Sequence, residues 1–230
     1  HISPIEHPDF EDYFASKLKI FAQAGLNCGN LDSDHAGRIL EAARQAGKPV
    51  FTFSQRDPQV DIYASQVRKE DGQTVFHVRT PQYEREFRLT MPGLFNVENA
   101  LGVIAVCHAL HVPPAAVYDG LVRARVPGRM ETYTNADGSL HAIVDYAHNR
   151  LSFETLFRSV RAEYPGREMA IVFGCPGKKA YDRRRDLGEA AGHWCDRVYL
   201  TEEDSGEEDT LDICREIAPN VEKAGCPVRI

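Results

Sequence analysis

The segment with the clearest chemical potential is a loop of glycine and lysine that follows an apolar run ending at Phe173. It reads Gly174-Cys175-Pro176-Gly177-Lys178-Lys179, and three arginines follow at positions 183 to 185, where a helix is expected to begin. Glycines let backbone amides approach an anion, and lysine and arginine supply charge for phosphate or carboxylate. We therefore predict an anion-binding loop. The alternative is an ordinary strand-to-helix turn with a solvated basic helix.

This loop is not a nucleotide P-loop. The pattern GxxxxGK[ST] needs an upstream glycine and a serine or threonine after the lysine, and neither Gly47-Lys48 nor Gly177-Lys178 meets that requirement. These residues cannot cradle a triphosphate as a P-loop does.

A second polar group, Asp145-Tyr146-Ala147-His148, ends an apolar run. An aspartate there can accept hydrogen bonds from ribose hydroxyls, and an aromatic ring can flank a base. The alternative is a capping aspartate beside a histidine with satisfied hydrogen bonds, and the local pattern alone favours that interpretation. His7, Lys17, His108 and His111 are likewise typical of helix surfaces.

An acidic run from Glu202 to Asp209 follows another apolar run. Such runs are usually solvated, and a helix beginning near Thr210 would be stabilised by negative charge at its start. The sharper interpretation is a site for a cationic substrate, because the run follows the carboxyl end of a predicted strand.

Composition narrows the class of protein. A net charge of -7 and a pI near 5.7 argue against a broad surface for nucleic acid or acidic lipid. Six scattered cysteines without CxxC pairing indicate reduced thiols and a cytoplasmic protein. No apolar stretch is long enough to span a bilayer, and no signal peptide is recognisable. The chain starts at His1 and stops at Ile230 within a pattern, so we expect both ends to be truncated.

The first half of the chain predicts helices and a strand, followed by an antiparallel insert around an Asp71-Gly72 turn. A break at Val126-Pro127-Gly128-Arg129 is taken as the boundary between two domains, 1–129 and 130–230. The expected elements are helices at 9–24, around 39–43, at 96–110 and from Pro114, a strand at 50–53 and the insert at 60–91.

The second half alternates strand and helix, which predicts an α/β domain with a parallel, doubly wound sheet. Ligands of such sheets bind at the carboxyl ends of the strands, here Asp145, Gly174 and Thr201. The expected strands are 142–145, 169–173 and 197–201, and the expected helices are 151–164, 184–192 and 210–217.

Several segments, taken in order, resemble UDP-N-acetylmuramyl tripeptide synthetases of the Mur ligase family. The resemblance covers nearly the whole chain and implies part of a central domain with an antiparallel insert, followed by part of a Rossmann-like C-terminal domain. The matching segments are His7-Pro8-Asp9-Phe10, Tyr13-Phe14-Ala15-Ser16-Lys17, Phe95-Asn96-Val97-Glu98-Asn99-Ala100, Val126-Pro127-Gly128-Arg129-Met130-Glu131, Asp145-Tyr146-Ala147-His148 and Phe173-Gly174-Cys175-Pro176-Gly177.

The resemblance implies a reaction in which ATP phosphorylates the carboxylate of a UDP-N-acetylmuramoyl-peptide and an amino acid's amine displaces the phosphate. It also implies Mg²⁺, held by His7 and by Lys17 as a carbamate. Carbamylation needs a neutral amine, so we expect Lys17 to have a lowered pKa through burial.

Further roles are implied for the nucleotide. Asn99 matches an asparagine that reads adenine, Arg129 an arginine reaching ATP, and Asp145 the aspartate on the ribose, with Tyr146 and His148 lining that site. In the C-terminal domain, Lys178 or Lys179 matches the basic residue of the glycine loop, and Arg184 matches an arginine near the substrates.

Two departures from the family pattern qualify these implications. Members that add diaminopimelate carry Asp-Asn-Pro-Arg where this chain has Glu203-Asp204-Ser205-Gly206. Glu203 and Asp204 therefore suit an extra ammonium group, as in lysine or ornithine. The P-loop is also missing, so this chain alone is expected to be inactive. Alternatives are a folylpolyglutamate synthetase-like ligase and a non-catalytic nucleotide-binding partner domain.

Overall fold

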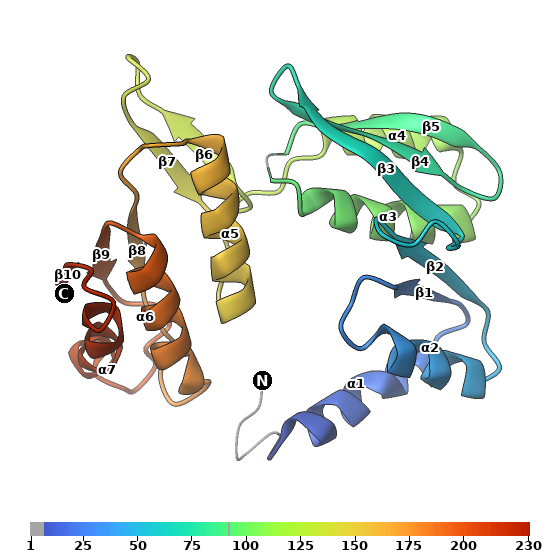
Figure 1. The fold of residues 1–230 in the computed structure, drawn as a ribbon. Coiled ribbons are helices and arrows are strands. Elements are labelled where there is room, and N and C mark those ends of the chain that lie inside the picture. The colour runs from blue at the N-terminus through green and yellow to red at the C-terminus, as the bar shows by residue number, and fades with distance from the viewer. Residues whose placement is uncertain (1–6, 92) are drawn as a thin grey trace. The chain divides into compact units, whose positions relative to one another are not determined.

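The computed structural model describes residues 7–91 and 93–230, which divide into two compact units. One unit runs from Phe14 to Asp145, and the other joins the residues up to Tyr13 with Tyr146 to Ile230 (Figure 1). We call them the first unit and the second unit. The domain boundary predicted at Arg129 stays a prediction. No helix among the described residues is long and apolar enough to cross a membrane.

The first unit begins with helices that pack through one aromatic ring. Helix α1 (Phe10–Gln23) buries Phe14, which lies against His35 and beneath the guanidinium of Arg38. The predicted first helix, second helix and first strand are confirmed by α1, α2 (Ala36–Gln45) and β2 (Val50–Ser54). Strand β1 (Asn27–Asn30) was not predicted, because Asn-Cys-Gly-Asn lacks β-branched and aromatic residues.

The antiparallel insert is confirmed, and it extends a parallel sheet. Strands β1, β2 and β3 (Ile62–Glu70) are parallel neighbours, and β4 (Gln73–Arg79) and β5 (Glu84–Leu89) continue the same sheet in antiparallel fashion. Asp71 and Gly72 join β3 to β4 with φ angles of 50° and 74°. Two consecutive positive φ angles are the geometry of a two-residue hairpin turn.

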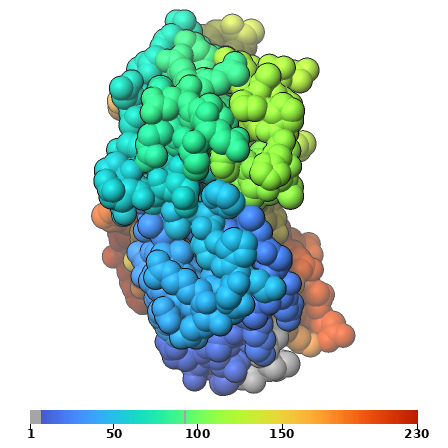
Figure 2. Space-filling model, turned by 90° about the vertical axis from the view of Figure 1, so that its right-hand side faces the viewer, coloured from blue at the N-terminus to red at the C-terminus, as the bar shows by residue number. Residues whose placement is uncertain are grey.

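Two further helices close the core of the first unit. Helices α3 (Asn96–Ala109) and α4 (Pro114–Arg123) pack against the sheet, and Figure 2 shows α4 beside the strands of the insert. Pro114 begins α4. The first N–H groups of a helix have no partner within the helix, so the N–H that proline lacks is not missed there. The fully buried side chains include Ile62, Phe76, Phe87, Leu101 and Ile104.

The expectation for the strand at 142–145 was wrong in its pairing. The segment at 142–145 was expected to start the parallel sheet, but β7 (His141–Val144) pairs antiparallel with β6 (Glu131–Thr134) in a separate two-stranded sheet. The physical reason lies in the turn between them. Gly138 adopts a φ of 72° and Asn135 hydrogen-bonds to the backbone at Leu140, which folds the two short strands into a hairpin.

The second unit confirms the predicted α/β class with a parallel sheet. Its strands lie in the order β10-β9-β8, all parallel, with helices between them. The elements are α5 (Arg150–Glu163), β8 (Ala170–Phe173), α6 (Asp182–Trp194), β9 (Arg197–Leu200), α7 (Thr210–Glu222) and β10 (Val228–Arg229).

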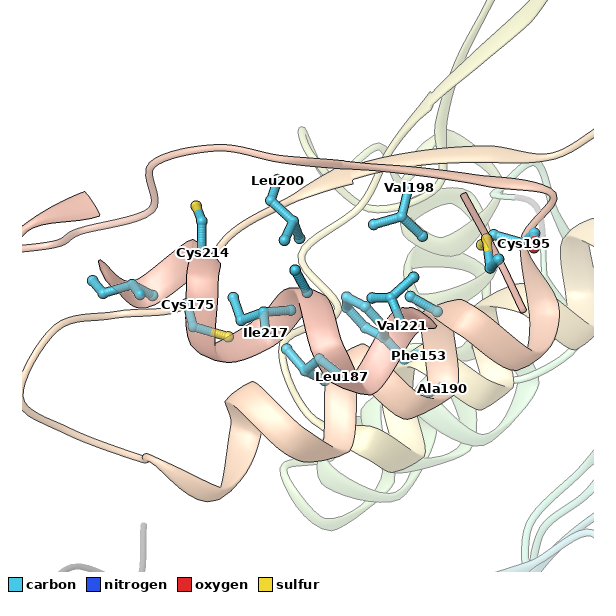
Figure 3. Close-up of a cluster of buried hydrophobic side chains, with 14 of the residues drawn as sticks. Phe153, Cys175, Leu187, Ala190, Cys195, Val198, Leu200, Cys214, Ile217 and Val221 are labelled. Atoms are coloured by element: carbon cyan, nitrogen blue, oxygen red, sulfur yellow. Dashed lines mark hydrogen bonds between the residues drawn. The ribbon is translucent and has the colours of Figure 1, made fainter. Parts of the chain in front are cut away.

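One core holds these elements together. Phe153 of α5, Leu187 of α6 and Ile217 of α7 converge on Leu200 of β9 (Figure 3). Helices α5, α6 and α7 therefore share a single face of the sheet. Val172 of β8, on the opposite face, is 67% exposed. The carboxyl ends of β8 and β9 are adjacent, so the loops that follow them are neighbours.

Candidate functional site

Two loops of the second unit are in direct contact. The glycine loop (Gly174–Lys179) follows β8, and the acidic loop (Glu202–Asp209) follows β9. The Gly177 N–H donates to the Asp204 carbonyl oxygen at 3.1 Å. A Cβ at Gly174 would lie 2.9 Å from the Glu203 nitrogen, and one at Gly177 would lie 2.8 Å from the Ser205 carbonyl carbon. Glycine at both positions is therefore required by the approach of one backbone to another.

Arg184 is buried beneath these loops. It is 2% exposed, and its guanidinium forms a fork with Glu208, with Nη1 to Oε1 and Nη2 to Oε2 both 2.8 Å. Nη1 also donates to Glu216 at 2.8 Å, and Nη2 donates to the Pro176 carbonyl at 3.4 Å. Charge-assisted bidentate bonds of this kind are among the stronger hydrogen bonds in proteins. Arg184 thus links α6 to the acidic loop, to α7 and to the glycine loop.

Electrostatics at this pair favour the charged forms. The hydrogen bond from Arg184, with a further bond from the Lys178 backbone, lowers the pKa of Glu208 to about 2. Hydrogen bonding to Glu208 in turn raises the pKa of Arg184. Glu208 also accepts the Lys178 N–H at 2.7 Å, so its carboxylate binds both Arg184 and the glycine loop.

The two lysines of the glycine loop extend to exposed carboxylates. Lys178 Nζ lies 2.6 Å from Glu207, and Lys179 Nζ lies 2.7 Å from Asp204, which raises the pKa of Lys179. Exposed pairs of this kind contribute little stability and exchange readily with solvent or ligand. The lysines predicted to bind an anion are therefore paired with carboxylates of the acidic run predicted to bind a cation.

The remaining acidic-loop carboxylates differ in their surroundings. Asp209 caps α7 by accepting hydrogen bonds from the Leu211 and Asp212 N–H groups, and Glu202 accepts one from Ser205. Glu203 makes no hydrogen bond or ion pair with any other described residue. Of the two predicted substrate-binding residues, Glu203 has an uncommitted carboxylate and Asp204 is paired.

Tyr146 and His148 lie together before α5. Their ring centroids are 5.0 Å apart, His148 Nδ1 lies 2.9 Å from the Tyr146 carbonyl, and Tyr146 is 62% exposed. A reciprocal capping box between Asn149 and Ser152 begins α5, and the Ser152 hydroxyl also accepts the His148 N–H. The rings are therefore held on a fixed helix start, and an exposed aromatic face can stack on a base.

Asp145 belongs to the first unit. Its Oδ2 accepts the Met130 N–H at 2.9 Å, and Met130 adopts a positive φ of 50°. Arg129, next to it, is exposed. The aspartate thus holds the backbone that immediately follows Arg129.

Asn99 lies in the first turn of α3. Its amide nitrogen donates to Asn96 Oδ1 at 3.0 Å.

Polar residues also lie at the carboxyl ends of β1 and β2. Glu98, next to Asn99 in the sequence, accepts a hydrogen bond from Asn30 at the end of β1, and Asp32 accepts hydrogen bonds from Ser54 and Gln55 at the end of β2. Sequence reasoning missed Asn30 as a candidate. Its position at a parallel strand's carboxyl end would have indicated it, had β1 been recognised.

His7 and Lys17, the residues expected to hold Mg²⁺, stay a prediction. His7 Nδ1 lies 2.7 Å from Asp12 Oδ2, and the ring of Tyr13 packs edge-on against the imidazole. Lys17 is exposed on α1, so the burial expected for it was wrong. Within residues 7–91 and 93–230, no three histidine, cysteine, aspartate or glutamate side chains gather as a metal site.

The predicted site residues fall into both units. Lys178, Arg184 and Asp204 are joined through the two contacting loops of the second unit. Glu203, Tyr146, His148 and His7 are in the same unit, and the first unit contains the remaining predicted residues, Lys17, Asn99, Arg129 and Asp145.

Comparison with known families identifies the class of protein. The Mur ligase middle domain matches residues 1–107, and the glutamate ligase domain of Mur ligases matches residues 128–229. The chain belongs to the Mur ligase family, whose members are ATP-dependent ligases that form amide bonds.

Individual relatives carry names that describe a particular activity within the family. The UDP-N-acetylmuramoyl-L-alanyl-D-glutamate--L-lysine ligase of Enterococcus faecalis is 35% identical over 97% of this chain and 44% of its own length. A UDP-N-acetylmuramyl-tripeptide synthetase of Bifidobacterium longum is 36% identical over 94% of this chain and 44% of its own length. The chain thus spans less than half the length of these relatives.

A solved structure supports the fold independently. The pseudomurein peptide ligase type C from Methanothermus fervidus superposes with a TM-score of 0.72 at 15% identity. The match covers 96% of this chain and 48% of that one.

Proposed function

We propose that these domains serve an ATP-dependent ligase that adds an amino acid to a UDP-N-acetylmuramoyl-peptide in peptidoglycan synthesis. The two relatives described above carry names of this activity. We also propose that the protein works in the cytoplasm, which agrees with six free cysteines among the described residues. A folylpolyglutamate synthetase-like activity is less well supported, because both relatives are named for peptide ligation to UDP-N-acetylmuramoyl substrates.

The chemistry proposed is activation of a carboxylate by the phosphoryl group of ATP, followed by attack of the amino acid's amine and release of phosphate. Asn99 is assigned to adenine, because an asparagine amide can both donate to and accept from that base. Arg129, Asp145, Tyr146 and His148 are assigned to the rest of the nucleotide. Arginine suits phosphate, and an aspartate carboxylate suits ribose hydroxyls.

Lys178 is assigned to the reacting phosphate or carboxylate, since its ammonium is exposed and only loosely paired. His7 and Lys17 are proposed for Mg²⁺, the family's usual metal, although the described residues do not complete such a site.

The incoming amino acid is proposed to be a diamino acid such as lysine. The observation that supports this choice is the composition of the acidic loop, where Glu203 is uncommitted, Asp204 is paired only with an exposed lysine, and Gly206 carries no side chain. A second ammonium group would find a carboxylate there. A second carboxylate would find none of the arginine charge that it requires.

A direct experiment measures product formation by the full gene product. That polypeptide includes any residues that the gene encodes before His1 and after Ile230. We expect ATP-dependent conversion of UDP-N-acetylmuramoyl-L-alanyl-D-glutamate and lysine to a tripeptide product, detected by mass spectrometry with release of phosphate. The 230-residue chain, which lacks a P-loop motif, is expected to give neither. Phosphate release without any amide product would contradict the proposal.

A further inference from the structure

The terminal nitrogens of Arg184 have no donor left for a substrate. A guanidinium carries four N–H groups on its two terminal nitrogens, and the four bonds to Glu208, Glu216 and Pro176 use all of them. Its fifth donor, on Nε, is fully buried and has no hydrogen-bond partner among the described residues. A substrate could reach this arginine only after the fork with Glu208 had broken.

Glu208 contacts the glycine loop as well as the arginine. One carboxylate oxygen, Oε2, accepts from both Arg184 Nη2 and the Lys178 backbone N–H, at 2.8 Å and 2.7 Å. The neighbouring Gly177 N–H is held by the Asp204 carbonyl. Two consecutive amides of the glycine loop are therefore fixed by the acidic loop.

The backbone at this contact is strained. Lys178, Ala180 and Asp204 have φ angles of 52°, 51° and 36°, a region that residues with side chains rarely occupy. Conformations of this kind persist only where the surroundings hold them. The fork and the two amide bonds join the loops at these residues, beside the exposed ion pairs of Lys178 with Glu207 and of Lys179 with Asp204.

We propose that Arg184 and Glu208 are positioning residues: the pair holds the glycine loop against the acidic loop and so sets the direction of Lys178. Neither side chain contacts the substrate. This inference rests on the proposed function for the identity of the reaction, but the loop positioning itself does not. It replaces the direct role near the substrates that the sequence suggested for Arg184.

The first test measures hydrogen exchange at individual backbone amides of the 230-residue chain. Glu208→Gln keeps the shape of the side chain and removes its charge, and it should speed exchange of the Gly177 and Lys178 amides by about tenfold or more. The matched control is Glu207→Gln, which makes the same change at a neighbour whose side chain is 86% exposed. That control should leave both amides within about twofold of the parent.

Folding of the variant is checked by the fluorescence of Trp194, the chain's single tryptophan, which packs on the core of the second unit. If Glu208→Gln does not fold, Glu208→Asp, which retains the charge but shortens the side chain, is measured instead with the same expectation. Unchanged exchange of the Lys178 amide in a folded Glu208 variant would overturn the proposal.

The second test uses the complete ligase and asks whether the two residues act as one. Arg184→Lys and Glu208→Gln should each lower kcat/KM by about 100-fold, because a displacement of roughly 1 Å at a reacting group has that effect. The double variant should lose no more than either single variant. Losses that multiply, to about 10,000-fold, would mean that Arg184 acts on the substrate directly.

The two tests distinguish failure of the proposed function from failure of the positioning role. If the parent protein forms no amide product, the proposed function is wrong, and the exchange measurement still decides whether the pair holds the loop. If product forms and the exchange rates are unchanged, the positioning role is wrong and the ligase activity stands.

Discussion

Replacing Gly177 by alanine should force the glycine loop away from the acidic loop. The new Cβ would overlap the Ser205 carbonyl oxygen and lie 2.8 Å from its carbonyl carbon and 3.1 Å from Glu208 Cβ. Two of these three atoms belong to backbone that cannot rotate away. The loops must therefore separate, and the hydrogen bond from the Gly177 N–H to Asp204 must lengthen or break.

The cost follows from these two effects. Overpacking a tight contact destabilises by about 1–3 kcal/mol, and the lost hydrogen bond adds about 1 kcal/mol. We expect Gly177→Ala to lower the free energy of unfolding of the second unit by about 2–4 kcal/mol. With a denaturant dependence of about 2 kcal/mol per molar urea, the midpoint should fall by about 1–2 M.

Trp194 fluorescence during urea unfolding is a suitable assay, because the single tryptophan lies in the second unit. Gly206→Ala provides a matched control in the acidic loop. Gly206 has a positive φ of 59°, but no atom lies within 4 Å of the position of an added Cβ. Its cost should be that of backbone strain alone, about 1 kcal/mol. A Gly177→Ala midpoint equal to that of the parent, or to that of the control, would refute the close approach of the loops.

Three further predictions concern the second unit. Because the folded pKa of Glu208 is about 2 and its ordinary value is 4.5, the stability from this group is present above pH 4.5 and is lost as pH falls towards 2; Glu208→Gln should lack this component in acid unfolding curves. Asn149→Ala removes the cap of α5 and should cost about 1 kcal/mol in thermal unfolding. Burial raises the pKa of Cys175 and of Cys195 to about 12, so a thiol reagent at pH 8 should modify them only after denaturation, with native labelling as the contrary result.

Much of the fold was predictable because its signals are local. The Asp71-Gly72 pair between alternating residues specifies a hairpin, and Pro114 marks the start of α4. The hairpin of β6 and β7 was missed although Gly138 supplies a similar signal, because the run at 142–145 was interpreted as part of a βα alternation. A short apolar run does not reveal which strand will be its neighbour.

The sequence indicated which residue types form the candidate site, and it did not indicate their contacts. Lys178, Arg184 and Glu203 were identified from a glycine loop, a helix start and an acidic run. That Arg184 lies buried against Glu208, 24 residues away, depends on β9 bringing the two loops together. Because Arg184 is buried, it holds the loop and is not available to a substrate. No local sequence pattern predicts burial of this kind.

Lys17 shows the opposite case. A helical pattern predicted a surface lysine, and the resemblance to Mur ligases replaced that prediction with a buried carbamate. The described chain has Lys17 exposed on α1. This exposure agrees with a surface lysine, and the role of Lys17 as a carbamate stays a proposal.

The most direct test of the account is amino-acid selectivity of the ligase as its gene encodes it. The ratio of kcat/KM for L-lysine to that for diaminopimelate should be at least about tenfold in favour of lysine, because the acidic loop offers carboxylates and no arginine at Gly206. Glu203→Gln should reduce that ratio by removing the uncommitted carboxylate. A ratio that favours diaminopimelate, or one that Glu203→Gln leaves unchanged, would contradict the assignment of the acidic loop to the second ammonium group.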